Sequence, residues 1–212
     1  MKSFKTHRGV IAPLDRANVD TDQIIAKQFL KSIARTGFGP QLFYDWRYSA
    51  DGKPNPQFSL NLPRYKNASV LVTRNNFGCG SSREHAVWAI LQYGFRAVIA
   101  PWRDNSGQRI PAFADIFRNN SFKNSLLTIE LSEPEVDKIF EMTERVPQLE
   151  VTVDVDEQRV VLHTGEELSF HFELDPAVKE RLLHGLDDIG ITLKEEAALK
   201  TFESKDHAQM KW

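Results

Sequence analysis

The sequence predicts an α/β fold with mixed β-sheets and flanking helices, and three observations carry this prediction. Apolar runs at 68–73 and 96–100 enclose a helical segment, which indicates a strand–helix–strand unit. Three stretches of alternating polarity between residues 149 and 174 indicate antiparallel strands. The 212 residues are 41% hydrophobic and 26% charged, which is typical of a globular chain with a sizeable core.

The first third of the chain is predicted to be irregular, with a short apolar run at 9–14 and an exposed turn over 51–57. A buried strand is expected at 68–73, followed by a helix to about Gln92 and a second strand at 96–100. A connection of this length implies that the two strands are parallel and joined by a right-handed crossover.

The polar segment 102–112 is predicted to be an exposed loop, and a strand resumes at 126–131. Ser132 is then expected to cap a helix that runs to about Val146, because proline and glutamate follow in its first turn. Alternating stretches at 149–155, 159–164 and 168–174 complete the second half as a meander of antiparallel strands.

The last fifty residues are predicted to be helical. The Asp175-Pro176 pair favours a helix start, and Gly185 can end that helix. A capping box at 192–195 predicts a final helix to about Ser204. Since no shift in composition marks a linker, we predict one domain over residues 1–212 with a helical C-terminal extension from about 175 to 212.

Charge and hydropathy exclude several classes of protein. The net charge is −2, whereas a nucleic-acid binder usually carries a basic excess. The longest apolar run, residues 86–91, is far shorter than the ~20 residues of a membrane helix. The first residues lack the apolar segment of a signal peptide, so we expect a cytoplasmic protein.

The chain has a single cysteine, Cys79. One cysteine forms no internal disulfide, which fits a reducing compartment. It also cannot hold an iron–sulfur cluster, which takes about three or four thiolates. We therefore expect this chain to bind no metal, and any such centre to belong to another chain.

The segment 75–86 carries the most chemical information. Two glycines, Gly78 and Gly80, permit a sharp turn after a predicted strand, and Ser81 and Glu84 have the spacing of a capping box. Ser81 is therefore expected at the N-cap of the helix, where free N–H groups favour anions. Arg83 adds a guanidinium that can grip a carboxylate. The segment predicts a carboxylate or phosphate site.

The residues Gly-Cys-Gly-Ser-Ser-Arg-Glu-His-Ala at 78–86 closely resemble the signature of the aconitase swivel-domain family, and above all its free-standing members, the small subunits of isopropylmalate dehydratases. The resemblance runs almost end to end and implies the swivel-like fold (β/β/α). Further matching segments occur in the family's order: 13–15, 18–25, 27–31, 35–39, 113–117, 120–122 and 185–190. The sequence departs from the family's pattern at the segment 102–112, which looks like a loop insertion before the matching segment 113–117.

The resemblance implies a hydro-lyase that isomerises 2-isopropylmalate and 3-isopropylmalate by dehydration and rehydration through 2-isopropylmaleate, a step of leucine biosynthesis. It also implies a large partner subunit that carries a [4Fe–4S] cluster, so that this chain would act only within a heterodimer.

For the site, the resemblance implies that Ser81 is the catalytic base in its alkoxide form and that Arg83 holds a substrate carboxylate, with Ser82 as a supporting donor. It places Thr21 and Asp22 among the substrate-binding residues beside the motif, where Asp22 would orient the arginine or the serine. In the family a loop in the region 27–39 meets the side group that distinguishes one malate from another. That region predicts three contacts, Phe29, Leu30 and Arg35, although packing of Phe29 into the core explains the pattern equally well.

Other interpretations stay open at this point. The substrate could be 2-methylmalate (citramalate) or dimethylmalate, or the chain could be a stand-alone carboxylate-binding module. Cys79 is expected to be a small residue in a tight turn rather than a nucleophile. His85 is expected to pack on its helix. His163 and His171 could face each other on neighbouring strands, but two ligands make a poor metal site.

Overall fold

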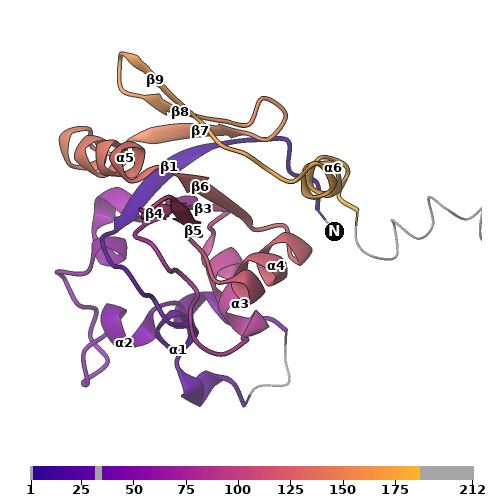
Figure 1. Cartoon of the computed structure of the whole chain (residues 1–212). Coiled ribbons are helices and arrows are strands. Elements are labelled where there is room, and N and C mark those ends of the chain that lie inside the picture. Colours follow the sequence, from indigo (N-terminus) through magenta and orange to yellow (C-terminus); the bar gives the residue numbers. More distant parts are fainter. Residues whose placement is uncertain (1, 32–34, 187–212) are drawn as a thin grey trace, which may run out of the picture.

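The computed structural model describes residues 2–31 and 35–186, and these build a seven-stranded sheet with helices on both faces (Figure 1). The strands of this sheet are β1 (Thr6–Leu14), β2 (Val70–Thr73), β3 (Ala97–Pro101), β6 (Leu127–Leu131), β7 (Glu150–Asp154), β8 (Arg159–His163) and β9 (Glu167–His171). The α-helices are α1 (Thr21–Ile24), α2 (Tyr44–Arg47), α3 (Glu84–Tyr93), α4 (Asp115–Lys123), α5 (Glu133–Arg145) and α6 (Pro176–His184). Four short 3₁₀ turns lie at Lys27–Phe29, Gly39–Gln41, Ser59–Asn61 and Pro63–Tyr65.

The strand order is β6-β3-β2-β1-β7-β8-β9. The first four strands are parallel, and β7, β8 and β9 add antiparallel strands to the other side of β1. The parallel pairing of β2 with β3 around α3 confirms the predicted strand–helix–strand unit, and the meander of β7 to β9 is confirmed as well. The sheet is therefore mixed, as the sequence predicts.

Strand β1 is the main addition to the predicted elements. It occupies the centre of the sheet, where its first half pairs with β7 and its second half with β2. The chain therefore passes from the antiparallel to the parallel part of the sheet along one strand. Thr6–Val10 pairs antiparallel with Glu150–Asp154, which lies more than a hundred residues further along the chain. The short apolar run 9–14 does not predict this pairing.

The two faces of the sheet bury separate hydrophobic clusters, since neighbouring side chains on a strand point to opposite faces. Leu71 and Val98 contribute to the cluster under α3 and α4. Val70 and Ile99 contribute to the cluster with α5 and the meander. Figure 1 shows α3, α4 and the N-terminal loops on one side of the parallel strands and the meander on the other. The parallel strands are therefore covered on both faces, by α3 and α4 on one side and by α5 and the meander on the other.

Local capping signals position the predicted helices. Ser132 and Glu135 form the capping box that opens α5. Asp175 caps α6 through its carboxylate, and Gly185 ends that helix in the left-handed conformation. The helix predicted after the capping box at 192–195 lies outside the described residues. No helix in the described part of the chain is long and apolar enough to cross a bilayer.

The segment predicted as a loop at 102–112 contains a hairpin instead, formed by β4 (Arg103–Asn105) and β5 (Gln108–Ile110). Ser106 and Gly107 both have positive φ, as the tight turns of two-residue hairpins require. All six strand residues are exposed, as predicted for the segment. Because no residue of the hairpin is buried, its sequence shows no alternation of polarity.

The two histidines of the meander do not face each other. In the register of β8 and β9, His163 pairs with Glu167 and His171 pairs with Arg159. His163 instead contacts Thr152, with 2.9 Å between Nε2 and Oγ1. The juxtaposition that the sequence left open does not occur, because the turn between β8 and β9 places the two residues at opposite ends of the strand pair.

Candidate active site at the carboxyl ends of the parallel strands

Three connections that leave the parallel strands β1, β2 and β3 run side by side beyond the sheet. Asp20 forms an isolated parallel bridge with Cys79, and Phe77 forms one with Phe113. Backbone hydrogen bonds join them further, from Thr21 to the Cys79 carbonyl at 2.9 Å and from Ala114 to the Phe77 carbonyl at 3.2 Å. Ligands of open α/β sheets bind beyond the carboxyl ends of the strands. The segment 78–83 thus lies between the other two connections.

A cavity of about 260 Å³ lies where these connections meet. Four of the predicted site residues, Thr21, Ser81, Ser82 and Arg83, line it together. Ser81 and Ser82 are exposed, and Arg83 is partly buried. Its complete lining is Thr21, Gly78, Gly80, Ser81, Ser82, Arg83, Ala114, Asp115, Ile116 and Phe117. The motif therefore faces an open cavity rather than the packed interior.

The prediction that Ser81 caps α3 is wrong. Helix α3 begins at Glu84, and its N-cap position is Arg83, whose side chain makes no capping hydrogen bond. Glu84 accepts a hydrogen bond from Asn124 Nδ2 at 2.9 Å, so its carboxylate is engaged at the end of α4. The Ser81 carbonyl accepts the Thr21 hydroxyl at 2.8 Å. Both contacts are tertiary, and they place Ser81 three residues before the helix.

Two of the three helices that border the cavity, α3 and α4, lack a side-chain cap at their N-terminal ends, whereas Asp20 caps the third, α1. The N-cap positions are Arg83 for α3 and Ala114 for α4, and neither side chain bonds to the backbone of its helix. The first N–H groups of a helix have no partner within the helix and carry partial positive charge. The guanidinium of Arg83 and the two helix ends favour an anion in this cavity, whose lining also includes the carboxylate of Asp115.

Arg83 is held in place by an aspartate from the neighbouring connection. Its Nε donates to Asp22 Oδ1 at 2.9 Å, and Lys27 Nζ lies 3.2 Å from Asp22 Oδ2. The Asp22 and Arg83 side chains are 29% and 27% exposed. The bond uses one of the five N–H donors of a guanidinium, which leaves the terminal nitrogens for a ligand. This contact supports the predicted role of Asp22 in orienting the arginine.

The charges around Asp22 keep it ionised. Burial acts to raise the pKa of Asp22, but hydrogen bonds from Arg83 and Lys27 and their positive charges outweigh it and bring the pKa below its usual value. The ion pair with Arg83 is therefore complete above the ordinary aspartate pKa, and it is lost only as the pH falls through the lowered value.

Glycines allow the three connections to approach so closely. Gly78 has φ +75°, and a Cβ there would lie 2.2 Å from Cγ of Phe117 on α4. Gly80 has φ +87°, and a Cβ there would lie 2.2 Å from the carboxylate of Asp20. Each glycine thus meets both requirements, a left-handed backbone and a contact without room for a side chain.

The two remaining residues of the motif fit structural roles. Burial and the charge of Asp20 raise the pKa of the Cys79 thiol, which disfavours the thiolate. His85 packs edge-on against Phe38 at 5.2 Å between ring centroids and lies 4.8 Å from Trp88. Its prediction as a packed helix residue is confirmed.

The three residues proposed to meet the substrate side group do not line the cavity. Phe29 packs edge-on against Tyr44 at 5.0 Å between ring centroids, and Leu30 packs against the core under α3. The Arg35 guanidinium lies 5.9 Å from the Trp88 ring. The alternative interpretation, that Phe29 packs into the core, agrees with these contacts.

Sequence reasoning missed two sets of residues. Lys27, the second ion-pair partner of Asp22, belongs to a matching segment but was assigned no role. The cavity wall formed by Ala114, Ile116 and Phe117 was also missed, because apolar side chains carry no chemical signature. The signal that could have located this wall is the matching segment 113–117, which the Phe77–Phe113 bridge brings to the site.

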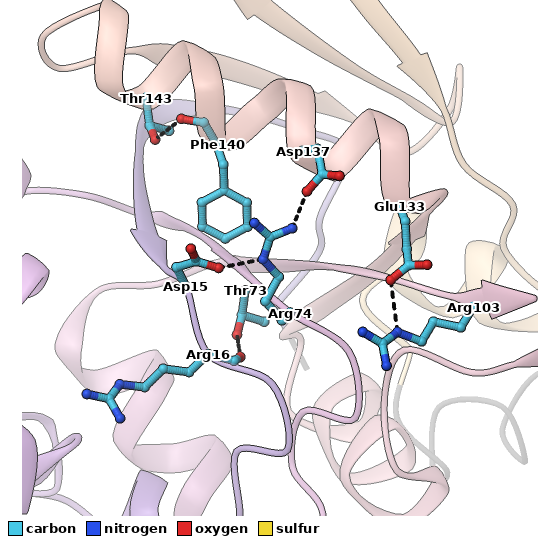
Figure 2. A network of polar contacts seen from close by, with 9 residues as sticks. All are labelled: Asp15, Arg16, Thr73, Arg74, Arg103, Glu133, Asp137, Phe140 and Thr143. Carbon is cyan, nitrogen blue, oxygen red and sulfur yellow. Dashed lines mark hydrogen bonds and ion pairs between the residues drawn. The ribbon is translucent and has the colours of Figure 1, made fainter.

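A larger cavity of about 430 Å³ lies next to the β2 end and α5. Figure 2 shows an ion network at its border, in which Arg74 lies between Asp15, at 2.5 Å from Nε, and Asp137. The guanidinium also covers the Phe140 ring at 4.2 Å from its centroid. Since both carboxylates neutralise Arg74, this network fastens α5 to the sheet and leaves the smaller cavity as the candidate active site.

The fold and this cavity agree with what comparison with known proteins finds. A family model for the aconitase C-terminal domain matches residues 1–134. The chain is 57% identical over 205 residues to the 3-isopropylmalate dehydratase small subunit of Desulforapulum autotrophicum, and the match covers 97% of this chain and 96% of that protein. The chain therefore belongs to the aconitase C-terminal domain family and, within it, to the 3-isopropylmalate dehydratase small subunits.

A solved structure shows the same fold. The crystal structure of a 3-isopropylmalate dehydratase from Methanocaldococcus jannaschii superposes with a TM-score of 0.61 at 24% sequence identity. The superposition covers 93% of this chain and 99% of that one. The predicted swivel-like α/β fold is thereby confirmed.

Proposed function

We propose that this chain works as the small subunit of a 3-isopropylmalate dehydratase and converts 2-isopropylmalate to 3-isopropylmalate through 2-isopropylmaleate, in leucine biosynthesis in the cytoplasm. One observation carries the proposal: Ser81, Ser82 and Arg83 line one cavity, and Asp22 holds the arginine there. This arrangement offers a hydroxyl and a guanidinium to an acid bound in the same small space.

The proton-transfer half of the reaction is assigned to this chain. Dehydration removes a hydrogen from the carbon next to a carboxylate, and a weakly acidic hydrogen of this kind needs a positioned base. We assign this role to Ser81, whose oxygen takes the proton as the hydroxyl leaves the neighbouring carbon. Rehydration returns a proton and a hydroxyl with their positions exchanged.

A serine oxygen becomes basic only where its negative charge is stabilised. Arg83 lies in the same cavity, and the N-terminal ends of α3 and α4 border it without side-chain caps. These positive groups favour the alkoxide form. They supply the positive environment that the sequence analysis had expected from an N-cap position of Ser81.

Substrate binding is assigned to Arg83, with Ser82 as a second donor and Thr21 as a support of the Ser81 backbone. The terminal nitrogens of Arg83 can form two parallel hydrogen bonds with a carboxylate. The Thr21 hydroxyl holds the Ser81 carbonyl at 2.8 Å, which fixes the serine relative to α1.

The residues of this chain do not fit an iron–sulfur cluster. The sequence has one cysteine, and no group of three or more metal-ligating side chains occurs in the described part of the chain. A [4Fe–4S] cluster is held by about four thiolates. We therefore assign the cluster to the large subunit and propose that this chain is active only when paired with it.

Mixing experiments test the proposal. The purified chain alone is expected to show no turnover, and addition of an iron–sulfur large subunit is expected to start the reaction, followed by the absorbance of the unsaturated acid 2-isopropylmaleate. The assembled enzyme is expected to show a higher kcat/KM with 2-isopropylmalate than with 2-methylmalate. Tight diacid binding by the isolated chain without turnover in any mixture would instead indicate a stand-alone carboxylate receptor.

Replacement of Asp22 with asparagine is expected to lower kcat/KM of the assembled enzyme about 10- to 100-fold, which corresponds to loss of a charge-assisted hydrogen bond of roughly 1.5–3 kcal/mol. The effect is expected mainly in KM, because Asp22 acts through the position of Arg83. Asp22→Glu is expected to restore part of the loss.

Asp51→Asn provides the matched control, because Asp51 pairs with Lys53 at 2.8 Å on an exposed loop. That variant is expected to keep wild-type kinetics. If both variants show the same kinetics, Asp22 is not a positioning residue of this site. Because the pKa of Asp22 is lowered, protonation of this carboxyl is expected to weaken substrate binding only when the pH falls below the ordinary aspartate range.

A further inference from the structure

The proposed reaction needs groups from two chains, so the cavity that contains Ser81 is one part of a complete site. Ser81 and Arg83 line this cavity, whereas the iron–sulfur cluster is assigned to the large subunit. Both sets of groups have to act on one small acid. The large subunit must therefore meet this chain at the cavity, and side chains exposed beside the cavity are in the right place to contact it.

The two exposed large hydrophobic residues in the described part of the chain lie on one segment, which leads from β3 into α4. Ile116 is 54% exposed and lines the cavity, and Ile110, at the end of β5, is 39% exposed. Single exposed apolar residues are common on protein surfaces. Two of them on the segment that borders the candidate site instead indicate a surface that binds another protein.

One partner can cover both isoleucines. They are six positions apart in the sequence, so the chain between them spans at most about 22 Å. Each side of a standard protein interface contributes roughly 800 Å², a patch about 28 Å across. The two side chains are therefore close enough to serve as contacts of a single interface.

The segment is held in a fixed position from both ends. Phe117 is 3% exposed and packs edge-on against Phe77 at 5.3 Å between ring centroids. The Ala112 N–H donates to Glu130 Oε1 on β6 at 3.1 Å, and Arg109 lies 3.2 Å from Glu130 Oε2. A surface that is already ordered loses little conformational entropy when a partner binds it.

Asp115 gives this surface a negative charge beside Ile116. Asp115 is exposed, lines the cavity and forms no ion pair with a basic side chain in the part of the chain that the structure describes. A carboxylate in this position repels the carboxylates of a bound diacid. A cationic side chain of the partner beside Asp115 would offset that repulsion and form an ion pair across the interface.

We infer that the large subunit docks on a surface formed by Ile110, Asp115 and Ile116, with apolar contacts to the two isoleucines and a lysine or arginine that pairs with Asp115. The inference rests on the proposed function, which gives this chain its partner, and deepens it by naming the contact surface. Ile110 belongs to the segment 102–112, where the sequence departs from the family's pattern. This part of the contact is therefore expected to be particular to this chain and its own large subunit.

The test measures the dissociation constant between the full chain and the iron–sulfur large subunit by isothermal titration calorimetry without substrate. Ile110→Ala and Ile116→Ala are each expected to raise it about 10-fold, the effect of truncating an interface anchor. Asp115→Lys is expected to raise it at least about 10-fold, because it brings like charges together. With saturating large subunit, Ile110→Ala is expected to reach the wild-type kcat, because Ile110 does not line the cavity.

Two variants in the meander provide the controls. Val161→Ala truncates a partly exposed apolar residue of β8, and Asp156→Lys reverses an exposed charge in the turn before that strand. The meander lies on the other side of the parallel strands from α3 and α4 (Figure 1). Both variants are expected to keep the wild-type dissociation constant, and circular dichroism checks that every variant is folded.

An unchanged dissociation constant in either isoleucine variant overturns the docking surface, and so does an equal loss in the meander controls. A loss in both isoleucine variants without a loss in Asp115→Lys overturns the pairing with a cationic side chain. A wild-type mixture that assembles without turnover of 2-isopropylmalate would overturn the proposed function and leave the docking surface intact. Absence of assembly in the wild type would overturn both.

Discussion

Replacing Ser81 with alanine is expected to lower kcat of the assembled enzyme about 100- to 10,000-fold, the usual contribution of a general base. The alanine removes the only atom of this side chain that can take a proton. Substrate affinity is expected to change little, because Arg83 and its partner Asp22 are untouched. Steady-state kinetics with 2-isopropylmalate as substrate measure both parameters.

Folding and assembly are expected to survive the change. Ser81 is exposed, and its contact with Thr21 uses the backbone carbonyl, which alanine keeps. Circular dichroism and gel filtration with the large subunit check this point. Near-normal kcat in Ser81→Ala would rule out the serine as the base.

Ser82→Ala separates the base from its neighbour. Ser82 lines the same cavity and is also exposed, so its replacement tests the loss of one hydroxyl at nearly the same place. As a supporting donor to substrate, Ser82 is expected to affect KM by about 10-fold, the value of an ordinary hydrogen bond near 1 kcal/mol or slightly more. Equal losses of kcat in both variants would contradict the distinct roles.

The sequence predicts those elements whose signals are local. The capping box at Ser132 and the Asp175-Pro176 start depend on residues within one turn, and both helices begin where they are expected. The parallel pair β2 and β3 follows from two buried runs at a distance that only a crossover can span. Neither signal requires knowledge of the rest of the chain.

Elements that depend on distant partners were not predictable in this way. Strand β1 finds its two partners at Val70 and Glu150, far along the sequence. The predicted cap at Ser81 does not form for a similar reason, because Glu84 accepts a hydrogen bond from Asn124 just after the end of α4. Local residue spacing predicted one conformation for each of these two segments, but tertiary contacts stabilise a different one.

The candidate site also contains one part that local sequence signals predict and one part that depends on tertiary contacts. Ser81, Ser82 and Arg83 adjoin one another in the sequence, so the motif alone places them in one site, and the resemblance adds Asp22. The apolar side chains of Ala114, Ile116 and Phe117 come from a separate connection, which backbone hydrogen bonds of Phe77 join to the site. A sequence motif marks polar chemistry well, whereas the hydrocarbon side of the same cavity became visible only in the fold.

Replacing Gly78 with alanine is expected to destabilise the chain by about 2–5 kcal/mol, the sum of overpacking and of a left-handed backbone at a residue with a side chain. The new methyl group would lie 2.2 Å from the Phe117 ring. That ring cannot turn aside easily, because it packs against Phe77 and Phe113. The Gly78 backbone is also fixed, since its N–H donates to the Val19 carbonyl at 2.8 Å.

Gly165→Ala separates the two costs. Gly165 has φ +91°, close to the value at Gly78, but a Cβ there would meet nothing within 4 Å. Its replacement therefore measures the backbone cost alone, about 1–2 kcal/mol. Urea unfolding of the two variants compares the free energies of unfolding, and equal losses would show that Phe117 accommodates the methyl group.

The Gly78 variant is also expected to affect the site beyond its loss of stability. Gly78 and Phe117 touch each other and both line the cavity, so relief of the clash is expected to move the start of α4 away from the Ser81 connection. At temperatures where Gly78→Ala is still folded, kcat/KM is expected to fall at least 10-fold, while Gly165→Ala keeps the wild-type value. A folded Gly78→Ala enzyme with full activity would show that catalysis does not depend on the close approach of these two connections.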